Sequence, residues 1–120
     1  MILIKTFTFD AAHNLVNYHG KCERLHGHTY KLVVKLSGTR GPEDMVYDFV
    51  DLKNLVKENV LDQFDHHYLN DFLPQPTAEN IAVYIWEVLE PLVKTDHAKL
   101  YEIEVWETKT SGIVYRGEES

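Results

Sequence analysis

The first third of the chain alternates between apolar and polar side chains. In residues 2–13, Phe7, Phe9 and Ala11 share one parity, and residues 26–37 alternate in the same way. A period of two is typical of β-strands that bury one face. The sequence therefore predicts a strand over each segment, with a polar loop between them.

Helical periodicity replaces this alternation in the middle of the chain. Apolar residues recur at spacings of three and four from about residue 51 to 63, and they form a broader stripe from 81 to 92. Such spacing indicates helices that bury one face. Pro74 and Pro76 separate the two helices, since proline interrupts a helix, and Thr77 suits the N-cap of the second helix.

Strand alternation returns over residues 99–107 and again over 113–116, with Tyr101 and Val105 on one parity. The predicted element order is therefore ββααββ. We expect an α+β fold in which an antiparallel sheet carries two helices on one face. A chain of 120 residues fits a single domain, here residues 1–120.

Composition and charge narrow the classes of function. The formal net charge of -7 argues against a sequence-independent nucleic-acid binder, which needs a basic face. No apolar run approaches the roughly 20 residues of a membrane span, and no signal peptide is evident. The single cysteine cannot form an internal disulfide, so we expect a free thiol and a cytoplasmic protein.

Three histidines form the first candidate site. His26 and His28 are two residues apart on a predicted strand, so both rings project from one face. His13 ends the preceding strand, and a hairpin between the two strands would bring the three rings together. Three imidazoles with one open position are the ligand set of a catalytic zinc site. The alternative is that the histidines are merely polar side chains at a strand end.

Cys22 lies in the polar loop between Lys21 and Arg24, and flanking cations favour a thiolate. It is a candidate general base or nucleophile. It could equally be a fourth zinc ligand, which would close the site and make it structural, or a small buried apolar residue.

Two acidic positions are further candidates. Asp65 and His66 could form an acid–base pair, because a carboxylate can orient an imidazole that titrates near neutrality; the alternative is a helix end with favourable histidines. Glu107 shares the parity of the apolar residue Val105. A carboxylate there would bind a metal or a planar N–H edge, unless the strand ends earlier and Glu107 is solvated.

These residues belong to a set of motifs that resembles the 6-pyruvoyltetrahydropterin synthase family. Within that family, the chain is most similar to the bacterial 6-carboxytetrahydropterin synthases, because Cys22 is followed by only three residues before His26. The motifs appear in order over nearly the whole chain: His13, Cys22 to His28, Asp48 to Lys53, Leu61 to Asn70, Pro76 to Asn80 and Val105 to Thr108.

The resemblance implies roles for these side chains. Zinc would be bound by three ligands, His13, His26 and His28. Cys22 would be the general base, with Asp65 and His66 completing a proton relay that a neighbouring subunit supplies. Glu107 would anchor a pterin ring. Thr77 would line the pterin pocket, although capping the helix is expected to be its main role.

The resemblance also implies a fold, an assembly and a reaction. The fold would be the tunnelling fold, in which ββααββ subunits form a trimeric barrel and two trimers stack into a homohexamer with active sites between subunits. The reaction would convert 7,8-dihydroneopterin triphosphate to 6-carboxytetrahydropterin, releasing triphosphate and acetaldehyde, in queuosine and 7-deazapurine biosynthesis. The partner would be this small pterin, with no nucleic acid and no membrane involved.

Other functions are compatible with the same motifs. The first is pyruvoyl-forming pterin synthesis, in which triphosphate is eliminated and the side chain is not cleaved. The second is a scaffold that binds pterin or zinc without catalysis. The third is a structural zinc module with Cys22 as the fourth ligand, which would unfold when the metal is chelated.

One turn departs from the pattern of the family. Glu43 and Asp44 stand where relatives often carry a Thr-Gly pair. The departure puts the geometry of this turn in doubt and leaves the candidate chemistry untouched.

Overall fold

A computed structural model describes residues 1–16, 18, 19 and 24–119. The described residues form one five-stranded sheet with the strand order β3-β1-β2-β4-β5. The two central pairs, β1 with β2 and β2 with β4, are antiparallel. The strands are β1 (Ile2–His13), β2 (His26–Gly38), β3 (His67–Tyr68), β4 (Ala98–Trp106) and β5 (Gly112–Tyr115).

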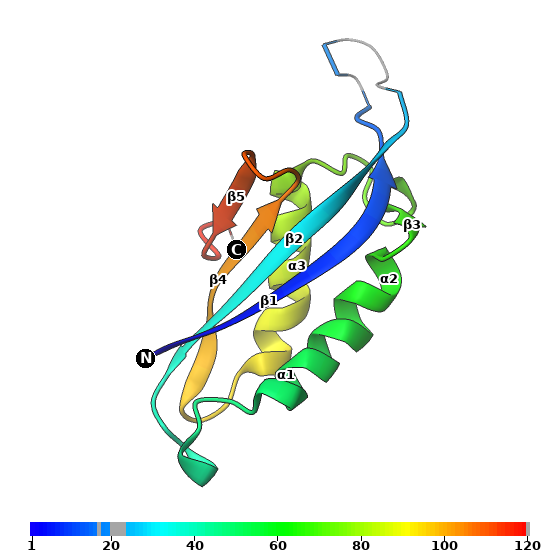
Figure 1. Cartoon of the computed structure of the whole chain (residues 1–120). Helices are drawn as coiled ribbons and strands as arrows, with labels where there is room; N and C mark the ends of the chain where they lie inside the picture. The colour runs from blue at the N-terminus through cyan, green and yellow to red at the C-terminus, as the bar shows by residue number, and fades with distance from the viewer. Residues whose placement is uncertain (17, 20–23, 120) are drawn as a thin grey trace.

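The two long helices cover one face of this sheet (Figure 1). Two α-helices, α1 (Phe49–Val56) and α2 (Asp62–Phe64), are joined by the π-helical turn η2 (Lys57–Leu61) into one continuous helix. The second long helix is α3 (Ala78–Val93), and two short 3-10 helices are η1 (Pro42–Asp44) and η3 (Leu69–Asp71). The predicted α+β fold, an antiparallel sheet with two helices on one face, is confirmed for the four longer strands, and only the short β3 pairs in parallel within the described residues.

The first helix begins earlier than the apolar periodicity indicates. Asp48 caps it, because its Oδ1 accepts hydrogen bonds from the backbone N–H groups of Val50 and Asp51 at 2.8 and 2.9 Å. The cap places the two exposed residues Phe49 and Val50 inside the helix, where an apolar stripe alone does not reveal them.

Strand β3 is an element that the sequence pattern does not predict. Its two residues pair in parallel with β1, His67 with Ala11 and Tyr68 with Ala12. Two residues are too few to display a period, so this pairing is set by tertiary contacts. It holds the segment after α2 against the edge of β1, next to the end of the strand that carries His13.

A β-bulge in β4 interrupts the alternation expected there. Lys35 pairs with Glu102 and Leu36 pairs with Leu100, so Tyr101 is the extra residue. Leu100 is buried at 4% exposure, whereas Tyr101 is only half-buried. The prediction that Tyr101 shares the core face with Val105 is therefore wrong. Beyond the bulge the expected parity holds as far as Trp106.

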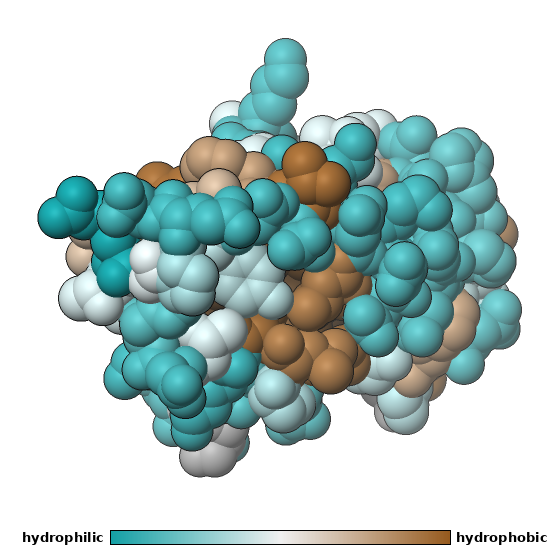
Figure 2. Space-filling view, turned by 90° about the horizontal axis from the view of Figure 1, so that it is seen from below, coloured by the Kyte–Doolittle hydropathy of each residue, from teal (hydrophilic) through white to brown (hydrophobic). Residues whose placement is uncertain are grey.

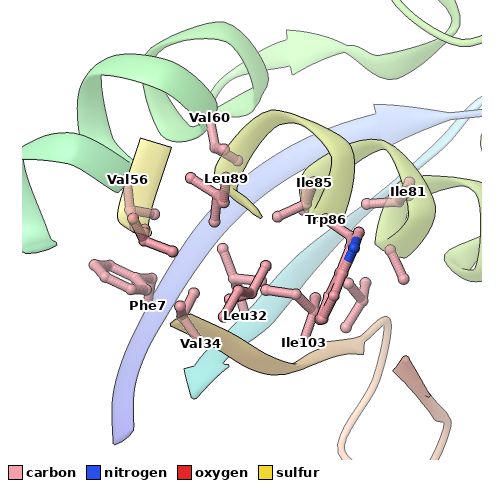
Figure 3. Packing of buried hydrophobic residues seen from close by; sticks show 14 of the residues in the cluster. Phe7, Leu32, Val34, Val56, Val60, Ile81, Ile85, Trp86, Leu89 and Ile103 are labelled. Carbon is pink, nitrogen blue, oxygen red and sulfur yellow. The ribbon is translucent and has the colours of Figure 1, made fainter. Parts of the chain in front are cut away.

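The core lies between the sheet and the two long helices. Leu32 and Ile103 from the sheet meet Ile81, Ile85 and Leu89 from α3 (Figure 3). All five are fully buried. Burying each such side chain stabilises the fold by about 1.5–3 kcal/mol before entropy is counted, so this layer fixes the sheet on which the candidate site is built.

The lower end of the molecule carries a hydrophobic area within a largely hydrophilic surface (Figure 2). Seen from below, Figure 2 shows hydrophobic surface in the middle of that end, flanked by hydrophilic side chains. None of the helices in the described part of the chain is both long enough and apolar enough to cross a lipid bilayer.

The turn that departs from the family pattern adopts a left-handed backbone. Glu43 and Asp44 have φ angles of 60° and 59°. This region costs most L-residues roughly 1–2 kcal/mol, whereas glycine enters it freely. Glycine itself loses about 0.5–1 kcal/mol through its flexible unfolded state.

We therefore expect Glu43→Gly to stabilise the fold by about 0.5–1 kcal/mol, the balance of these two effects. The free energy of unfolding, measured in urea, checks this. Glu43→Ala removes the same charge without relieving the backbone and should give no gain. An equal gain in both variants would assign the effect to charge instead of backbone conformation.

Candidate functional site

The pairing of β1 with β2 brings three histidines together. His13 pairs with His26, and Ala11 pairs with His28, so the three rings project from the sheet face that carries the helices. The ring centroid of His13 lies 4.8 Å from that of His26 and 5.0 Å from that of His28. One ring nitrogen from each histidine lies within 4.8 Å of the other two.

Backbone carbonyl groups fix which nitrogen the rings of His13 and His26 present. Nδ1 of His13 lies 2.9 Å from the carbonyl oxygen of Pro76, and Nδ1 of His26 lies 2.9 Å from that of Arg24. A carbonyl only accepts, so Nδ1 of each neutral ring donates and Nε2 keeps its lone pair. The hydroxyl of Tyr30 also lies 3.2 Å from Nδ1 of His13. Metal-binding histidines are commonly oriented in this way.

The donor set and its burial fit a zinc ion. His13 is only 2% exposed, and its Nε2 makes no hydrogen bond within the part of the chain that the structure describes. Tetrahedral zinc at about 2.1 Å from each nitrogen requires nitrogens roughly 3.4 Å apart, so nitrogens that now lie up to 4.8 Å apart would move inward. Imidazole nitrogens also suit iron, nickel and copper, so the geometry supports a metal site without selecting one metal.

Glu107 lies beside this cluster, one residue beyond the end of β4. Its Oε1 is 3.2 Å from Nε2 of His13 and 3.8 Å from Nε2 of His28, and its side chain is 30% exposed. Glu107 is thus neither buried in the core nor fully solvated. It lies beside His13 and His28 and is partly open to solvent.

A surface depression of about 340 Å³ adjoins Glu107 and reaches the start of α3. Thr77 lines it as well, so the structure brings together the two residues assigned to pterin binding. Thr77 also caps α3, because its Oγ1 accepts a hydrogen bond from the backbone N–H of Asn80 at 3.1 Å. The other lining residues are Leu15, Ala78, Glu79, Ser111, Gly112 and Ile113.

Asp65 and His66 form the expected pair. Oδ2 of Asp65 lies 3.1 Å from Nδ1 of His66. Neighbouring side chains usually point apart, but His66 has a φ of 60°, which turns both groups to the same side. Asp10 holds this conformation through its backbone: its N–H donates to Oδ1 of Asp65 at 2.8 Å, and its carbonyl accepts from the N–H of His66.

The Asp65–His66 pair is associated with a different face of the sheet from the three histidines. Asp10 has the opposite strand parity to His13, so its side chain projects from the other sheet face. The side chains of Asp10, Asp65 and His66 converge there, and Thr29 donates a hydrogen bond to Oδ1 of Asp10 at 2.5 Å. Cys22, the predicted general base, lies outside the described residues.

Comparison with known proteins gives this arrangement a context. The family model described as 6-pyruvoyl tetrahydropterin synthase matches residues 2–118. The chain belongs to the 6-pyruvoyl tetrahydropterin synthase family. The resemblance read from the motifs is thereby confirmed.

Individual members of the family carry two different names. The chain is 40% identical to the 6-carboxy-5,6,7,8-tetrahydropterin synthase of Synechocystis, over 95% of this chain and 92% of that protein. It is 33% identical to the 6-pyruvoyl tetrahydrobiopterin synthase of Dictyostelium discoideum, over 98% and 97%. The structure of 6-pyruvoyl tetrahydropterin synthase from Caenorhabditis elegans superposes with a TM-score of 0.83 at 29% identity, covering 98% of this chain and 96% of that one.

Sequence reasoning did not find several residues that contact the histidine cluster or the Asp65–His66 pair. Tyr30 could have been, because it continues the parity of His26 and His28 along β2. Asp10 and Thr29 are polar residues on an outward-facing parity and resemble ordinary surface positions. Pro76 contributes only a carbonyl oxygen, which no side-chain pattern reveals.

The pKa of the Asp65 carboxyl lies below its ordinary value. The main cause is the hydrogen bond from the N–H of Asp10, and the nearby His66 ring contributes less. This lowered pKa stabilises the fold above the unfolded-state pKa of about 3.9. The contribution is lost as the pH falls through the folded-state pKa.

We expect His66→Asn to leave the pKa of Asp65 below its ordinary value, because the Asp10 hydrogen bond remains. Asparagine tolerates a positive φ, so the turn should persist. Carboxyl ¹³C chemical shifts followed through an acid titration would measure this. A return of Asp65 to the pKa of an exposed aspartate would make the imidazole the main cause.

Proposed function

We propose that the chain is a zinc-dependent pterin synthase that converts 7,8-dihydroneopterin triphosphate to 6-carboxytetrahydropterin, with release of triphosphate and acetaldehyde. The observation that carries the proposal is the three-histidine cluster lying next to a depression that Glu107 and Thr77 line. A metal centre beside an anchor for a flat heteroaromatic ring is what a metal-assisted reaction on a pterin side chain requires.

Glu107 is proposed to bind the pterin ring. The amino group and ring N–H of a pterin present two parallel donors, and a carboxylate accepts both in a bidentate, charge-assisted pair. The partial exposure of Glu107 leaves it open to a ligand. Thr77 lines the same depression and contributes the capped N-terminus of α3 to its wall.

His13, His26 and His28 are proposed to hold zinc through Nε2, with the tautomers of His13 and His26 set by the carbonyl groups of Pro76 and Arg24. Bound zinc would supply Lewis acidity to the hydroxyl oxygens of the substrate side chain. The protein residues then bind the ring, keep the side chain at the metal centre and move protons.

Cys22 is proposed to remove a proton from the substrate as a thiolate, and His66, oriented by Asp65, to transfer protons on the opposite side. Within one copy of the chain, the Asp65–His66 pair is associated with the outer sheet face and the histidine cluster with the inner one. This arrangement supports a proton relay supplied by a neighbouring subunit, and the resemblance to the family implies that the homo-oligomer is a hexamer built from two trimers.

The proposal also distinguishes between two products, 6-carboxytetrahydropterin and its pyruvoyl counterpart. The short spacing from Cys22 to His26 supports the carboxy-forming branch, which lies on the route to queuosine. Pyruvoyl-forming synthesis is the second candidate, because relatives with that name match the chain over nearly its whole length at 33% identity.

Incubation with 7,8-dihydroneopterin triphosphate tests the function. Chain loaded with a measured amount of zinc should yield 6-carboxytetrahydropterin by mass spectrometry and equimolar acetaldehyde by enzymatic assay. Chelated chain should yield neither, and zinc should restore both. A pyruvoyl product without acetaldehyde would favour the second candidate. No turnover by zinc-loaded chain would contradict both and favour a binding scaffold.

We expect Cys22→Ala to abolish turnover while the zinc content stays at the wild-type level. Loss of a general base typically costs about 10²–10⁴-fold in rate. Zinc is measured by elemental analysis after gel filtration, with His13→Ala as the variant that should lose it. Loss of zinc from Cys22→Ala would instead make Cys22 a metal ligand.

A further inference from the structure

Two side-chain amides pair with the backbone just beyond the end of β1. Oε1 of Gln75 accepts from the N–H of Val16 at 2.6 Å, and its Nε2 donates to the carbonyl of Val16 at 2.7 Å. Asn70 repeats the arrangement with Asn14, at 3.0 and 2.9 Å. An amide carries the same donor and acceptor as a peptide unit. Each side chain therefore takes the place of a strand residue that is missing from the pairing.

These two pairs hold the neighbours of Leu15 on either side of it in the sequence, and Leu15 lines the depression. Thr77, two residues after Gln75, lines the same depression. The two hydrogen bonds between Val16 and Gln75 connect the segment of Leu15 to the segment of Thr77, and the two between Asn14 and Asn70 hold the other neighbour of Leu15 to η3.

The segment that carries Gln75 is itself fixed from the helix side. Nδ2 of Asn80, in the first turn of α3, donates to the carbonyl of Gln75 at 2.7 Å. The next carbonyl, that of buried Pro76, meets Nδ1 of His13 at 2.9 Å. Gln75 is therefore held on a rigid support, and its side chain can transmit that position to Val16.

We propose that Asn70 and Gln75 are positioning residues for the ligand pocket. Together they form an amide clamp, meaning the four hydrogen bonds from these two side chains to Asn14 and Val16. The clamp sets the separation of Leu15 from Thr77 and so fixes the width of the pocket before a flat ligand enters. The inference rests on the proposed function in that the ligand is taken to be a pterin.

The physical reason for such a clamp is preorganisation. Asn14 and Val16 lie beyond the end of β1 and outside its pairing with β2, and the clamp supplies hydrogen bonds to their peptide groups. A wall that is free to move must be ordered when the ligand binds, and that ordering weakens binding. A clamped wall is ordered in advance, which lowers the dissociation constant without any direct contact to the ligand.

The clamp is tested with Gln75→Met, which keeps the length of the side chain and removes both hydrogen bonds. We expect the dissociation constant of neopterin, a fluorescent oxidised pterin, to rise about tenfold on the zinc-loaded variant, as the loss of one or two hydrogen bonds predicts. The KM of the proposed substrate should rise by the same factor with little change in kcat. Hydrogen exchange at the Val16 amide should accelerate.

Gln63→Met is the matched control, because Gln63 is an exposed amide on α2 whose partner is the hydroxyl of Tyr84. It should bind neopterin like the wild type. Asn70→Leu provides a second variant if Gln75→Met does not fold. Equal neopterin binding by wild type and either clamp variant, with accelerated exchange at the freed amide, would overturn the clamp alone. A wild-type chain that binds no neopterin would overturn the pterin pocket and the clamp together.

Discussion

The register between β1 and β2 is the constraint on which the candidate site depends. His13 faces His26 across the pair, and Ala11 faces His28. A slip of one residue would turn His26 and His28 to the opposite sheet face and destroy the cluster. The stacked rings of Phe9 and Tyr30, 5.0 Å apart and inclined by 3°, lie next to the cluster in the core and oppose such a slip. The same packing that stabilises the fold therefore also determines where the histidine nitrogens lie.

The metal centre and the depression beside it share their supports. Pro76 provides a carbonyl to His13 and directly precedes the residue that caps α3. Glu107 lies within 3.2 Å of a histidine nitrogen while it also lines the depression. The negative charge of the Glu107 carboxylate, which lies next to buried histidine nitrogens, is stabilised best when a positive charge is bound among those nitrogens. Occupancy of one part of the site is thus expected to influence the other.

The sequence predicts those parts of the site that follow from strand parity. The three histidines and Glu107 could be placed because a period of two assigns each side chain to a face. Thr77 could be placed because capping depends on local chemistry. The pairing of Asp65 with His66 could not be derived from the sequence pattern alone. It depends on a positive φ at His66, and contacts with the distant residue Asp10 hold that conformation. The sequence pattern did not predict strand β3 or the bulge at Tyr101 for the same reason: both are determined by strand partners that are distant in the sequence.

The left-handed backbone at His66 restricts which sequences can occupy this position. Beyond glycine, residues that enter this region with some frequency are asparagine, aspartate and histidine, and β-branched residues are nearly excluded. Among these, only histidine carries a group whose ordinary pKa lies near neutrality. Backbone geometry and proton transfer would therefore select the same residue independently. A lineage that lost the proposed proton transfer could drift toward asparagine or glycine here, while drift to valine or isoleucine would require the whole turn to be rebuilt.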